Sequence, residues 1–506
     1  MMKNSIISWL EEAAAVCPDR TALEDTTDSY TYAQYRRNAR RIASYLMTEC
    51  GVKETGRPVV VYIDRNALSV FAFLGAVYTG NFYVPVDPTM PESRCEMILE
   101  SLQPAAVLDA GGRMKAAGVT QVADILSDEP LSEEEEKRID RRVEDIIDTD
   151  PLYSIFTSGS TGVPKGVLIS HRGVLDLVAA FDEAFHFNEE DIFANQAPFD
   201  FDVSVKDLYN AMACRGCVYI VPKKYFMMPK QLVAVLSEKK ITVLIWAVSA
   251  VRIVADFAVL NQEEHPLSLR YLMFSGEIMP VRALNYWREN LPETICVNLY
   301  GPTEITCNCT YHIIDRTYAP DAMLPIGRSF RNMRVTLRDE QGNVIAEPGK
   351  TGEICVAGTG LALGYYDMPE KTAESFADDP CVSGYKAKIY HTGDMGYYDE
   401  EGLLFFAARA DSQIKHMGHR IELGEIEAAL NGIPFLHVAC CLYDQSAEKI
   451  LCIYEAEEEC KKEIVAALSK KLPKFMWPNR YIHMEKLPMN SHDKIDRQAL
   501  KKEYLS

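Results

Sequence analysis

The sequence of 506 residues has the composition of a globular protein, with 48% hydrophobic and 25% charged residues. This length exceeds what one ordinary hydrophobic core serves, so we expect two or more domains. The net charge of −20 argues against a surface for nucleic acid or for an anionic membrane, because either surface requires a basic patch.

Hydropathy along the sequence gives no sign of a membrane span. No apolar run approaches the roughly 20 residues that cross a bilayer, so we expect no membrane insertion. The N-terminal residues are soon followed by Glu11 and Glu12, which does not fit a secretory signal. The expected location is therefore the cytoplasm.

The fourteen cysteines are mostly scattered singly. Cys214 and Cys217 have CxxC spacing, but no second CxxC completes a metal site. The pair precedes a strand-like run at 218–221, so we expect a turn with buried thiols. A redox or zinc role is the alternative.

The N-terminal part alternates helical and strand patterns. A helical pattern at 35–46 is followed by short apolar runs at 58–63 and 105–108, which are typical of α/β layers. Residues 127–150 are acidic, and we expect a solvated helix or connector there.

The pattern changes near residue 410, where we place a domain boundary. A strand pattern at 402–408 comes first, and a strand at 413–416, a turn at Gly418 and a helix from 424 come after it. Two further strands (438–443 and 450–454) and a helix (462–471) complete a small α+β pattern. The predicted domains are residues 1–410 and 411–506.

Residues 157–166 form the most informative segment. A largely apolar run at 152–156 leads into it, and four hydroxyls, three glycines and one lysine then fall within ten residues. Glycines let backbone N–H groups approach an anion, and hydroxyls and a lysine add donors and charge, as a polyphosphate requires. The spacing is not that of a Walker A loop. A flexible linker is the alternative interpretation.

This segment resembles the phosphate loop of the adenylate-forming superfamily, which contains acyl-CoA synthetases, luciferases and the adenylation domains of non-ribosomal peptide synthesis. The resemblance runs from about residue 30 to Lys494, and the later motifs follow in family order. These motifs are Tyr300-Gly301-Pro302-Thr303-Glu304, His391-Thr392-Gly393-Asp394, Ala408-Arg409-Ala410-Asp411, residues 413–427, and Asp493-Lys494-Ile495-Asp496-Arg497.

The resemblance implies an α/β fold. Its large N-terminal domain has several subdomains of β-sheets flanked by helices, and its small C-terminal α+β domain is mobile. ATP and Mg²⁺ are the implied cofactors. A tyrosine ring offers a stacking face for adenine, and a carboxylate on a Gly-Pro turn can hold Mg²⁺. Ala408 departs from the glycine that is usual at this position in the family.

The resemblance also implies a role for individual residues. The implied phosphate contacts are Thr157, Ser158, Gly159, Thr161 and Lys165, and the implied nucleotide contacts beyond the loop are Tyr300, Thr303, Asp394, Arg409 and Lys494. The implied catalytic residues are Lys494, Glu304 and Thr157, with Glu304 as the metal ligand. Asp411 matches the hinge and Gly418 the thiol tunnel. His391 receives no catalytic role.

The implied reaction has two steps. A substrate carboxylate attacks the α-phosphorus of ATP and releases pyrophosphate, and a thiol then attacks the acyl-adenylate and releases AMP. Positioning and charge neutralisation carry the first step, because a carboxylate is already a nucleophile.

Asp202 matches the aspartate that pairs with the α-ammonium of amino-acid substrates in this superfamily. A buried unpaired carboxylate is unfavourable, so we expect an amino acid rather than a fatty or aryl acid. The implied pocket residues are Asp202, Val203, Lys206, Ile245, Met273, Ser275, Leu299, Cys307 and Asn308.

The sequence around Lys206 does not decide which amino acid is the substrate. In the pocket it would suit a second carboxylate, as in aspartate or glutamate. It could instead pair with Asp202 four residues earlier, or face solvent. Alanine, serine or another small amino acid remains an equal alternative.

The amino-acid sequence around Asp202 resembles that of the D-alanine:carrier-protein ligases, and no carrier module follows Lys494. We therefore expect a free-standing enzyme that loads a separate phosphopantetheinyl carrier protein. The alternatives are an acyl-CoA or aryl-acid ligase, an oxygenase of the luciferase kind, and a non-catalytic relative. The last would be expected to lack Lys165, Glu304, Asp394 or Lys494, and all four are present.

Overall fold

The computed structural model describes residues 4–157, 164–409, 413–488 and 495–505. Five of the expected site residues lie outside these ranges. They are Ser158, Gly159, Thr161, Asp411 and Lys494.

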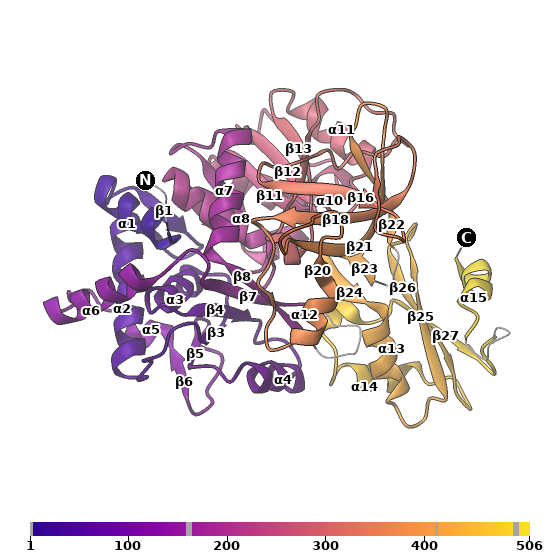
Figure 1. Ribbon diagram of the computed structural model, residues 1–506, viewed down its shortest axis with the longest axis horizontal. Helices are drawn as coiled ribbons and strands as arrows, with labels where there is room; N and C mark the ends of the chain where they lie inside the picture. The colour runs from indigo at the N-terminus through magenta and orange to yellow at the C-terminus, as the bar shows by residue number, and fades with distance from the viewer. Residues whose placement is uncertain (1–3, 158–163, 410–412, 489–494, 506) are drawn as a thin grey trace. The chain divides into compact units, whose positions relative to one another are not determined.

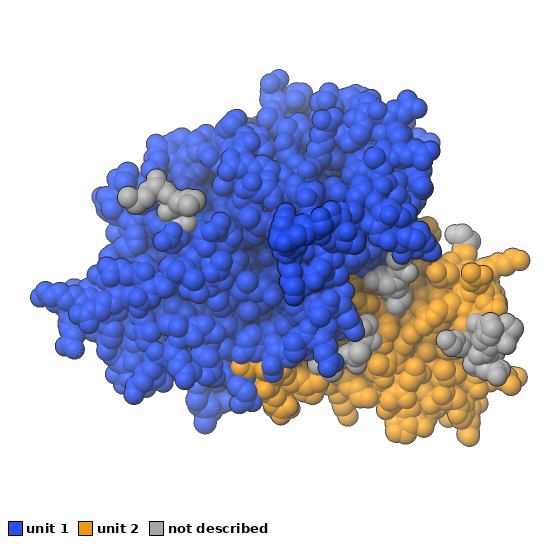
Figure 2. All heavy atoms as spheres, viewed as in Figure 1, with its two compact units in different colours: residues 1–88, 103–155, 166–410 blue, residues 89–102, 156–165, 411–506 orange. Residues whose placement is uncertain are grey.

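The chain divides into two compact units (Figure 2). Unit 1 comprises Met1–Pro88, Gln103–Ile155 and Gly166–Ala410, and unit 2 comprises Thr89–Leu102, Phe156–Lys165 and Asp411–Ser506. Unit 2 therefore includes two segments that are distant from its main part in sequence.

One sheet of unit 1 carries most of the residues discussed below (Figure 1). Its strands are β1 (Thr21–Glu24), β2 (Ser29–Thr31), β9 (Ile192–Asn195), β10 (Cys217–Ile220), β11 (Val243–Ala247), β12 (Tyr271–Ser275), β13 (Ile295–Tyr300), β14 (Thr310–Ile313) and β15 (Arg328–Ser329). They lie in the order β15-β14-β13-β12-β11-β9-β10-β1-β2. The strands from β13 across to β10 are parallel, so β9, β11, β12 and β13 end at one edge, which we call the carboxyl edge.

The two faces of this sheet contribute to different hydrophobic cores. Ile245, Met273 and Leu299 belong to one core, whereas Leu244 and Phe274 belong to the other. This division follows from the two-residue alternation of side chains along a strand. Helix α8 (Val203–Cys214) contributes to the first core and packs against β9, β10 and β11.

A second sheet, formed mostly by residues of unit 1, has the order β19-β8-β7-β4-β3-β5-β6. These strands are β3 (Pro58–Tyr62), β4 (Phe82–Val86), β5 (Ala106–Asp109), β6 (Val119–Gln121), β7 (Pro151–Thr157), β8 (Lys165–Ser170) and β19 (Gly364–Tyr365). A third sheet contains β16 (Met333–Arg338), β17 (Val344–Ile345), β18 (Gly352–Gly358), β20 (Phe376–Asp378), β21 (Lys388–Tyr398) and β22 (Leu404–Arg409).

The other helices of unit 1 are α1 (Ile7–Val16), α2 (Tyr32–Thr48), α3 (Ala67–Tyr78), α5 (Val122–Ile125), α6 (Glu133–Asp145), α7 (His171–Phe185), α9 (Pro229–Glu238), α10 (Val248–Asp256), α11 (Val281–Asn290) and α12 (Pro369–Ser375). Helix α2 begins at a capping box formed by Thr31 and Gln34. Helix α6 buries only Ile139 among its own residues, which agrees with the solvated helix expected at 127–150.

The C-terminal part of unit 2 has small sheets and short helices. The elements are β23 (Gln413–His416), β24 (His419–Glu422), α13 (Leu423–Asn431), β25 (Val438–Asp444), β26 (Lys449–Glu455), α14 (Lys461–Leu468), β27 (Arg480–Met484) and α15 (Arg497–Tyr504). Helix α4 (Glu92–Leu102) joins this unit, where Arg94 and Glu425 form a buried ion pair of 2.5 Å. The predicted mixed α/β fold is confirmed.

Within the described ranges, no helix is both long enough and apolar enough to traverse a bilayer.

Candidate active site

Many of the expected site residues of unit 1 gather near the carboxyl edge. Ser275 is the last residue of β12, Tyr300 is the last residue of β13, and Asp202 directly precedes α8, which follows β9. In open α/β sheets, ligands bind beyond the carboxyl ends of parallel strands. A binding site is therefore expected at this edge.

Tyr300 links this edge to the third sheet. Its hydroxyl donates to Asp394 Oδ2 at 2.6 Å, and Arg409 Nη1 donates to Asp394 Oδ1 at 2.5 Å. All three side chains are largely shielded from solvent. Burial raises the pKa of Tyr300 well above its ordinary value, so its phenol remains a donor at neutral pH.

Glu304 lies just beyond Tyr300, in the short helix η2 (Thr303–Ile305). Its side chain is fully buried, and Tyr365 Oη donates to Glu304 Oε1 at 2.9 Å. Thr303 is buried beside it. A buried carboxylate is unfavourable unless it is hydrogen-bonded or holds a cation, so Glu304 suits a metal ligand.

Residues 300–308 form a tight segment that brings its two ends together. A Cβ atom on Gly301 would lie 2.6 Å from Asn308 Cα, so this position requires glycine. Thr306 and Cys307 both adopt positive φ angles, of 53° and 76°. Such backbone strain in non-glycine residues gathers at functional sites.

Lys206 lies on α8 with its ammonium buried against this segment. Lys206 Nζ donates to Asn308 Oδ1 at 2.9 Å and to Ser275 Oγ at 3.2 Å. The residue is 1% exposed, which excludes the solvent-facing orientation. In the described part of the chain, Asp202 is not a hydrogen-bond partner of Lys206, which excludes the pairing along the helix.

The apolar residues expected in the pocket lie on one face of the sheet. Ile245 and Met273 are register partners on β11 and β12, and Leu299 lies on β13. All three are buried in the same core as α8, and Val203 at the start of α8 is half-buried. Cys307 is buried beside Lys206, where burial raises the pKa of its thiol.

Thr157 and Lys165 flank the phosphate-loop segment. Thr157 ends β7 and Lys165 begins β8, and both are buried. The hydroxyl of Thr157 is buried without a hydrogen-bond partner in the described part of the chain. An orphaned buried hydroxyl is unfavourable in the absence of a ligand and suits a site for a polar group.

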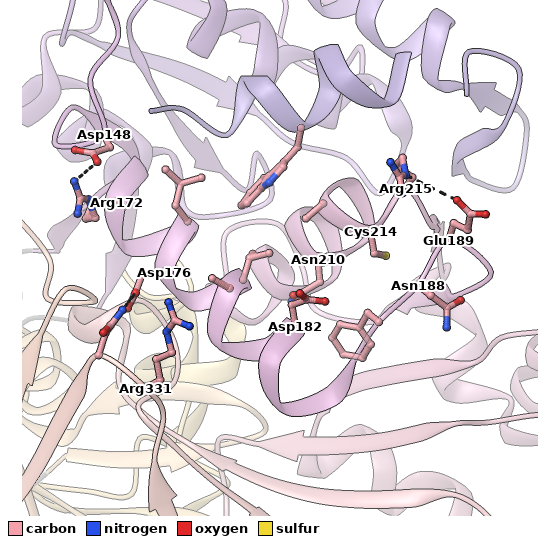
Figure 3. A pocket seen from close by; sticks show the side chains of 17 residues that line it. Asp148, Arg172, Asp176, Asp182, Asn188, Glu189, Asn210, Cys214, Arg215 and Arg331 are labelled. Carbon is pink, nitrogen blue, oxygen red and sulfur yellow. Dashed lines mark hydrogen bonds and ion pairs between the residues drawn. The ribbon is translucent and has the colours of Figure 1, made fainter. Parts of the chain in front are cut away.

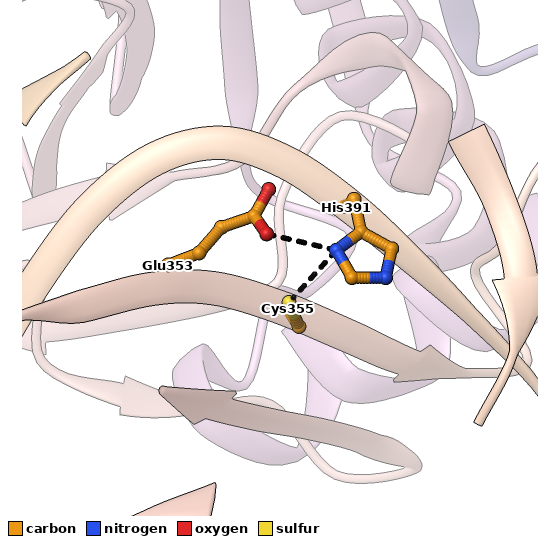
Figure 4. A group of neighbouring side chains, drawn as sticks. All are labelled: Glu353, Cys355 and His391. Carbon is orange, nitrogen blue, oxygen red and sulfur yellow. Dashed lines mark hydrogen bonds and ion pairs between the residues drawn. The ribbon is translucent and has the colours of Figure 1, made fainter. Parts of the chain in front are cut away.

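A second polar cluster supports the part of β21 that carries Asp394. Figure 4 shows the side chains of Glu353 and Cys355 directed at His391 Nδ1, at 2.8 Å and 3.5 Å. Glu353 Oε1 also accepts from the backbone N–H of Gly393 at 3.0 Å. The hydrogen bond to Glu353 raises the pKa of His391. These contacts hold the backbone of β21 next to Asp394.

A cavity of about 890 Å³ lies elsewhere in unit 1 (Figure 3). Its lining includes three arginines, each paired with an acidic neighbour: Arg172 with Asp148, Arg215 with Glu189 and Arg331 with Glu183. None of the expected site residues in the described ranges lines this cavity. The cavity is therefore separate from the candidate active site.

The two cysteines of the CxxC pair lie on either side of the connection between α8 and β10. Cys214 ends α8 and Cys217 begins β10, and burial raises the pKa of each thiol to about 12. This agrees with the expected turn with buried thiols.

Gly418 and Met417 form the two-residue turn between β23 and β24, and both have positive φ, as a type I′ turn requires.

Sequence reasoning did not find Tyr365 or Glu353. Tyr365 binds Glu304 across 61 residues, and Glu353 binds the backbone of Gly393 across 40 residues. No local pattern in the sequence marks either residue.

The sequence is similar to one family of known proteins. The AMP-binding enzyme family matches residues 10–366. A D-alanine–D-alanyl carrier protein ligase from Listeria monocytogenes serotype 4a (strain HCC23) is 31% identical over 520 residues, which covers 99% of each chain. Tyrocidine synthase 1 from Brevibacillus parabrevis is 31% identical over 504 residues, but 98% of this chain spans only 45% of that protein.

A solved structure is also similar. Holo-PA1221, described as a non-ribosomal peptide synthetase protein containing adenylation and PCP domains, superposes with a TM-score of 0.84 at 26% identity. The match covers 99% of this chain and 84% of that one. The family match spans more than half of the chain, and the ligase is matched from end to end. The chain belongs to the AMP-binding enzyme family.

Proposed function

We propose that this protein is an ATP-dependent ligase that joins an amino acid to the phosphopantetheine thiol of a separate carrier protein. In the first step an oxygen of the amino-acid carboxylate attacks the α-phosphorus of ATP, and the bond to the β-phosphate oxygen breaks. In the second step the thiolate attacks the carbonyl carbon of the aminoacyl-adenylate, and AMP leaves. We place the reaction in the cytoplasm, since none of the cysteines in the described ranges is in a disulfide.

The continuity of residues 300–308 supports this proposal most directly. Tyr300, at the start of the segment, is bonded to Asp394, and Glu304 follows. Asn308, at its end, is bonded to Lys206 of α8. One short segment thus joins a candidate nucleotide site to a candidate amino-acid site, as transfer between two bound substrates requires.

The nucleotide roles follow the family resemblance. Tyr300 stacks on adenine, Asp394 and Arg409 contact the ribose, and Thr303 lies beside them. Among the described residues, each Asp394 oxygen accepts one hydrogen bond, and a second lone-pair direction on each suits a ribose hydroxyl. Thr157, Ser158, Gly159, Thr161 and Lys165 hold the phosphates. Lys494 contacts both the carboxylate and the α-phosphate.

The buried carboxylate of Glu304 has the chemistry of a Mg²⁺ ligand, so the ion fits here. Bound at Glu304, it would offset negative charge on the phosphates. Asp202 pairs with the substrate α-ammonium, and Val203, Ile245, Met273 and Leu299 form the apolar wall with Ser275, Cys307 and Asn308. Residues 1–410 then form the adenylating domain and 411–506 a mobile domain with its hinge at Asp411 and its thiol tunnel at Gly418.

The test is to trap the activated acid with hydroxylamine. The protein is incubated with MgATP and a panel of L- and D-amino acids, fatty acids and aryl acids, and hydroxamate and pyrophosphate are measured together. Formation of both products with an amino acid is the expected result. Products only from acids without an α-amine would replace this proposal by an acyl-CoA or aryl-acid ligase.

A further inference from the structure

The buried ammonium of Lys206 has no balancing charge among its hydrogen-bond partners. It donates to Asn308 Oδ1 at 2.9 Å and to Ser275 Oγ at 3.2 Å, and both acceptors are neutral. Burying an ammonium is unfavourable unless the charge is paired. A ligand that brings negative charge would complete this arrangement.

The carboxylates on the same helix do not supply that charge through a direct contact. Asp207 follows Lys206 directly, and consecutive helical side chains do not face each other. Asp207 Oδ2 instead accepts from Asn195 Nδ2 at 3.0 Å. Among the described residues, no ion pair joins Lys206 to Asp202 or Asp207.

The groups around Lys206 also offer more donors than acceptors. Because lysine only donates, the Asn308 atom that faces it must be the amide oxygen. Asn308 Nδ2 therefore points away, and it is buried without a hydrogen-bond partner in the described part of the chain. The hydroxyl hydrogen of Ser275 adds a further donor. Two carboxylate oxygens would satisfy such a donor set.

Asp202 and Lys206 have opposite effects on the pKa of the buried Cys307 thiol. Burial and the nearby Asp202 raise the pKa of Cys307, whereas Lys206 lowers it, so both charges act on this one side chain. Asp202 and Lys206 are four positions apart, which is about 6 Å along a helix axis. That separation suits a small molecule with an ammonium at one end and a carboxylate at the other.

We propose that Lys206, Asn308 and Ser275 form a receptor for a side-chain carboxylate, and that the substrate is an acidic amino acid. This inference rests on the proposed function, because it assigns the side-chain end of the same amino-acid site. It selects the acidic class from the two that the sequence left open. Two observations favour an acidic substrate: the neutral hydrogen-bond acceptors of Lys206, and the buried amide N–H groups of Asn308 that have no partner in the described part of the chain.

The first experiment compares substrates in the full-length protein. ATP–pyrophosphate exchange is measured with aspartate and glutamate of both hands, with asparagine and glutamine, and with alanine and serine. An acidic amino acid is expected to exceed its own amide by about tenfold or more in kcat/KM. A neutral winner would overturn the carboxylate receptor and leave the ligase proposal intact, whereas exchange with no amino acid would overturn the ligase proposal itself.

The second experiment changes the receptor. In Lys206→Met, kcat/KM for the acidic substrate is expected to fall by about 10- to 100-fold relative to neutral amino acids. Lys230→Met is the matched control, since Lys230 is an exposed helical lysine on α9, and its substrate profile should equal that of the unmodified protein.

Asn308→Asp provides a test that does not depend on Lys206→Met folding. This change keeps an oxygen for Lys206 but replaces the buried N–H donors by negative charge. The variant is expected to fold, because it gains an ion pair with Lys206, and to lose its preference for acidic substrates. An unchanged substrate profile in Asn308→Asp would overturn the proposal.

Discussion

The phenol of Tyr300 donates a 2.6 Å hydrogen bond to Asp394, although 94 residues separate them. This contact ties the end of β13 to β21 of another sheet. The second oxygen of Asp394 accepts from Arg409 on β22. The side chains that we assign to adenine and ribose therefore hold one another in place before any nucleotide binds.

Replacing Tyr300 by phenylalanine separates the hydrogen bond from the ring. In Tyr300→Phe the ring that stacks on adenine remains, so we expect the KM for ATP to rise only a few-fold. Loss of one buried hydrogen bond should lower the free energy of unfolding by about 1 kcal/mol. Urea unfolding and the ATP dependence of pyrophosphate release measure the two effects.

Tyr32→Phe is the control for this change. The buried Tyr32 hydroxyl donates to Gly216 O at 2.8 Å, away from Asp394. A similar loss of stability is expected, with no change in the KM for ATP. An equal rise in KM in both variants would contradict the assigned contact of Tyr300 with the nucleotide.

Glu304→Gln tests the metal ligand without changing the size of the side chain. The amide oxygen can still accept from Tyr365, so the fold should be retained. An amide is a weaker ligand for Mg²⁺ than a carboxylate, so pyrophosphate release should fall by about 100-fold and require more Mg²⁺. Tyr365→Phe should reduce activity less. Full activity in Glu304→Gln at low Mg²⁺ would exclude the metal role.

Local patterns in the sequence predicted much of the fold. β23 spans the four residues expected at 413–416, because the alternation and the turn at Gly418 are encoded by neighbouring residues. The helix expected at 462–471 ends earlier, at Leu468. The N–H groups of Lys471 and Leu472 bond back to Leu468 O, and Pro473 disfavours helix at the residue before it.

The contacts within the candidate site could not be predicted in the same way. Lys206 binds Asn308 across 102 residues and Ser275 across 69, so its local sequence leaves three orientations open. The tertiary fold supplies the acceptors, because it brings Ser275 of β12 and Asn308 within hydrogen-bond distance of Lys206. The motifs predicted which residues belong to the candidate site, whereas the tertiary fold determines which of their atoms form hydrogen bonds.

Thr157→Val tests the orphaned hydroxyl at the end of β7. The hydroxyl has no partner in the described part of the chain, so its removal should leave the melting temperature unchanged or raise it slightly. If the hydroxyl contacts phosphate, pyrophosphate release should fall by about tenfold. Thr336→Val, at another orphaned hydroxyl on β16, should change stability in the same way and leave activity unchanged. Unchanged activity in Thr157→Val would remove Thr157 from the phosphate site.

Asp207 should make stability depend on pH. Burial raises the pKa of this carboxyl to about 8, against the opposing effects of its hydrogen bond to Asn195 and of the charges on Lys206 and Arg65. Between the ordinary pKa of 3.8 and this value, the unfolded chain is charged at Asp207 while the folded chain keeps the proton. Folding is therefore disfavoured progressively as pH rises, by up to about 1.4 kcal/mol per pH unit.

Asp207→Asn removes this titration and keeps an oxygen for Asn195. The stability gained over the unmodified protein should grow from about pH 4 to pH 8 and then level off, as measured by urea unfolding at each pH. Asp339→Asn should show the opposite sign. Hydrogen bonds from Asn343 lower the pKa of Asp339, so its charged form stabilises the fold above pH 3.8. A difference for Asp207→Asn that stays constant with pH would show that this carboxyl is already charged in the folded protein.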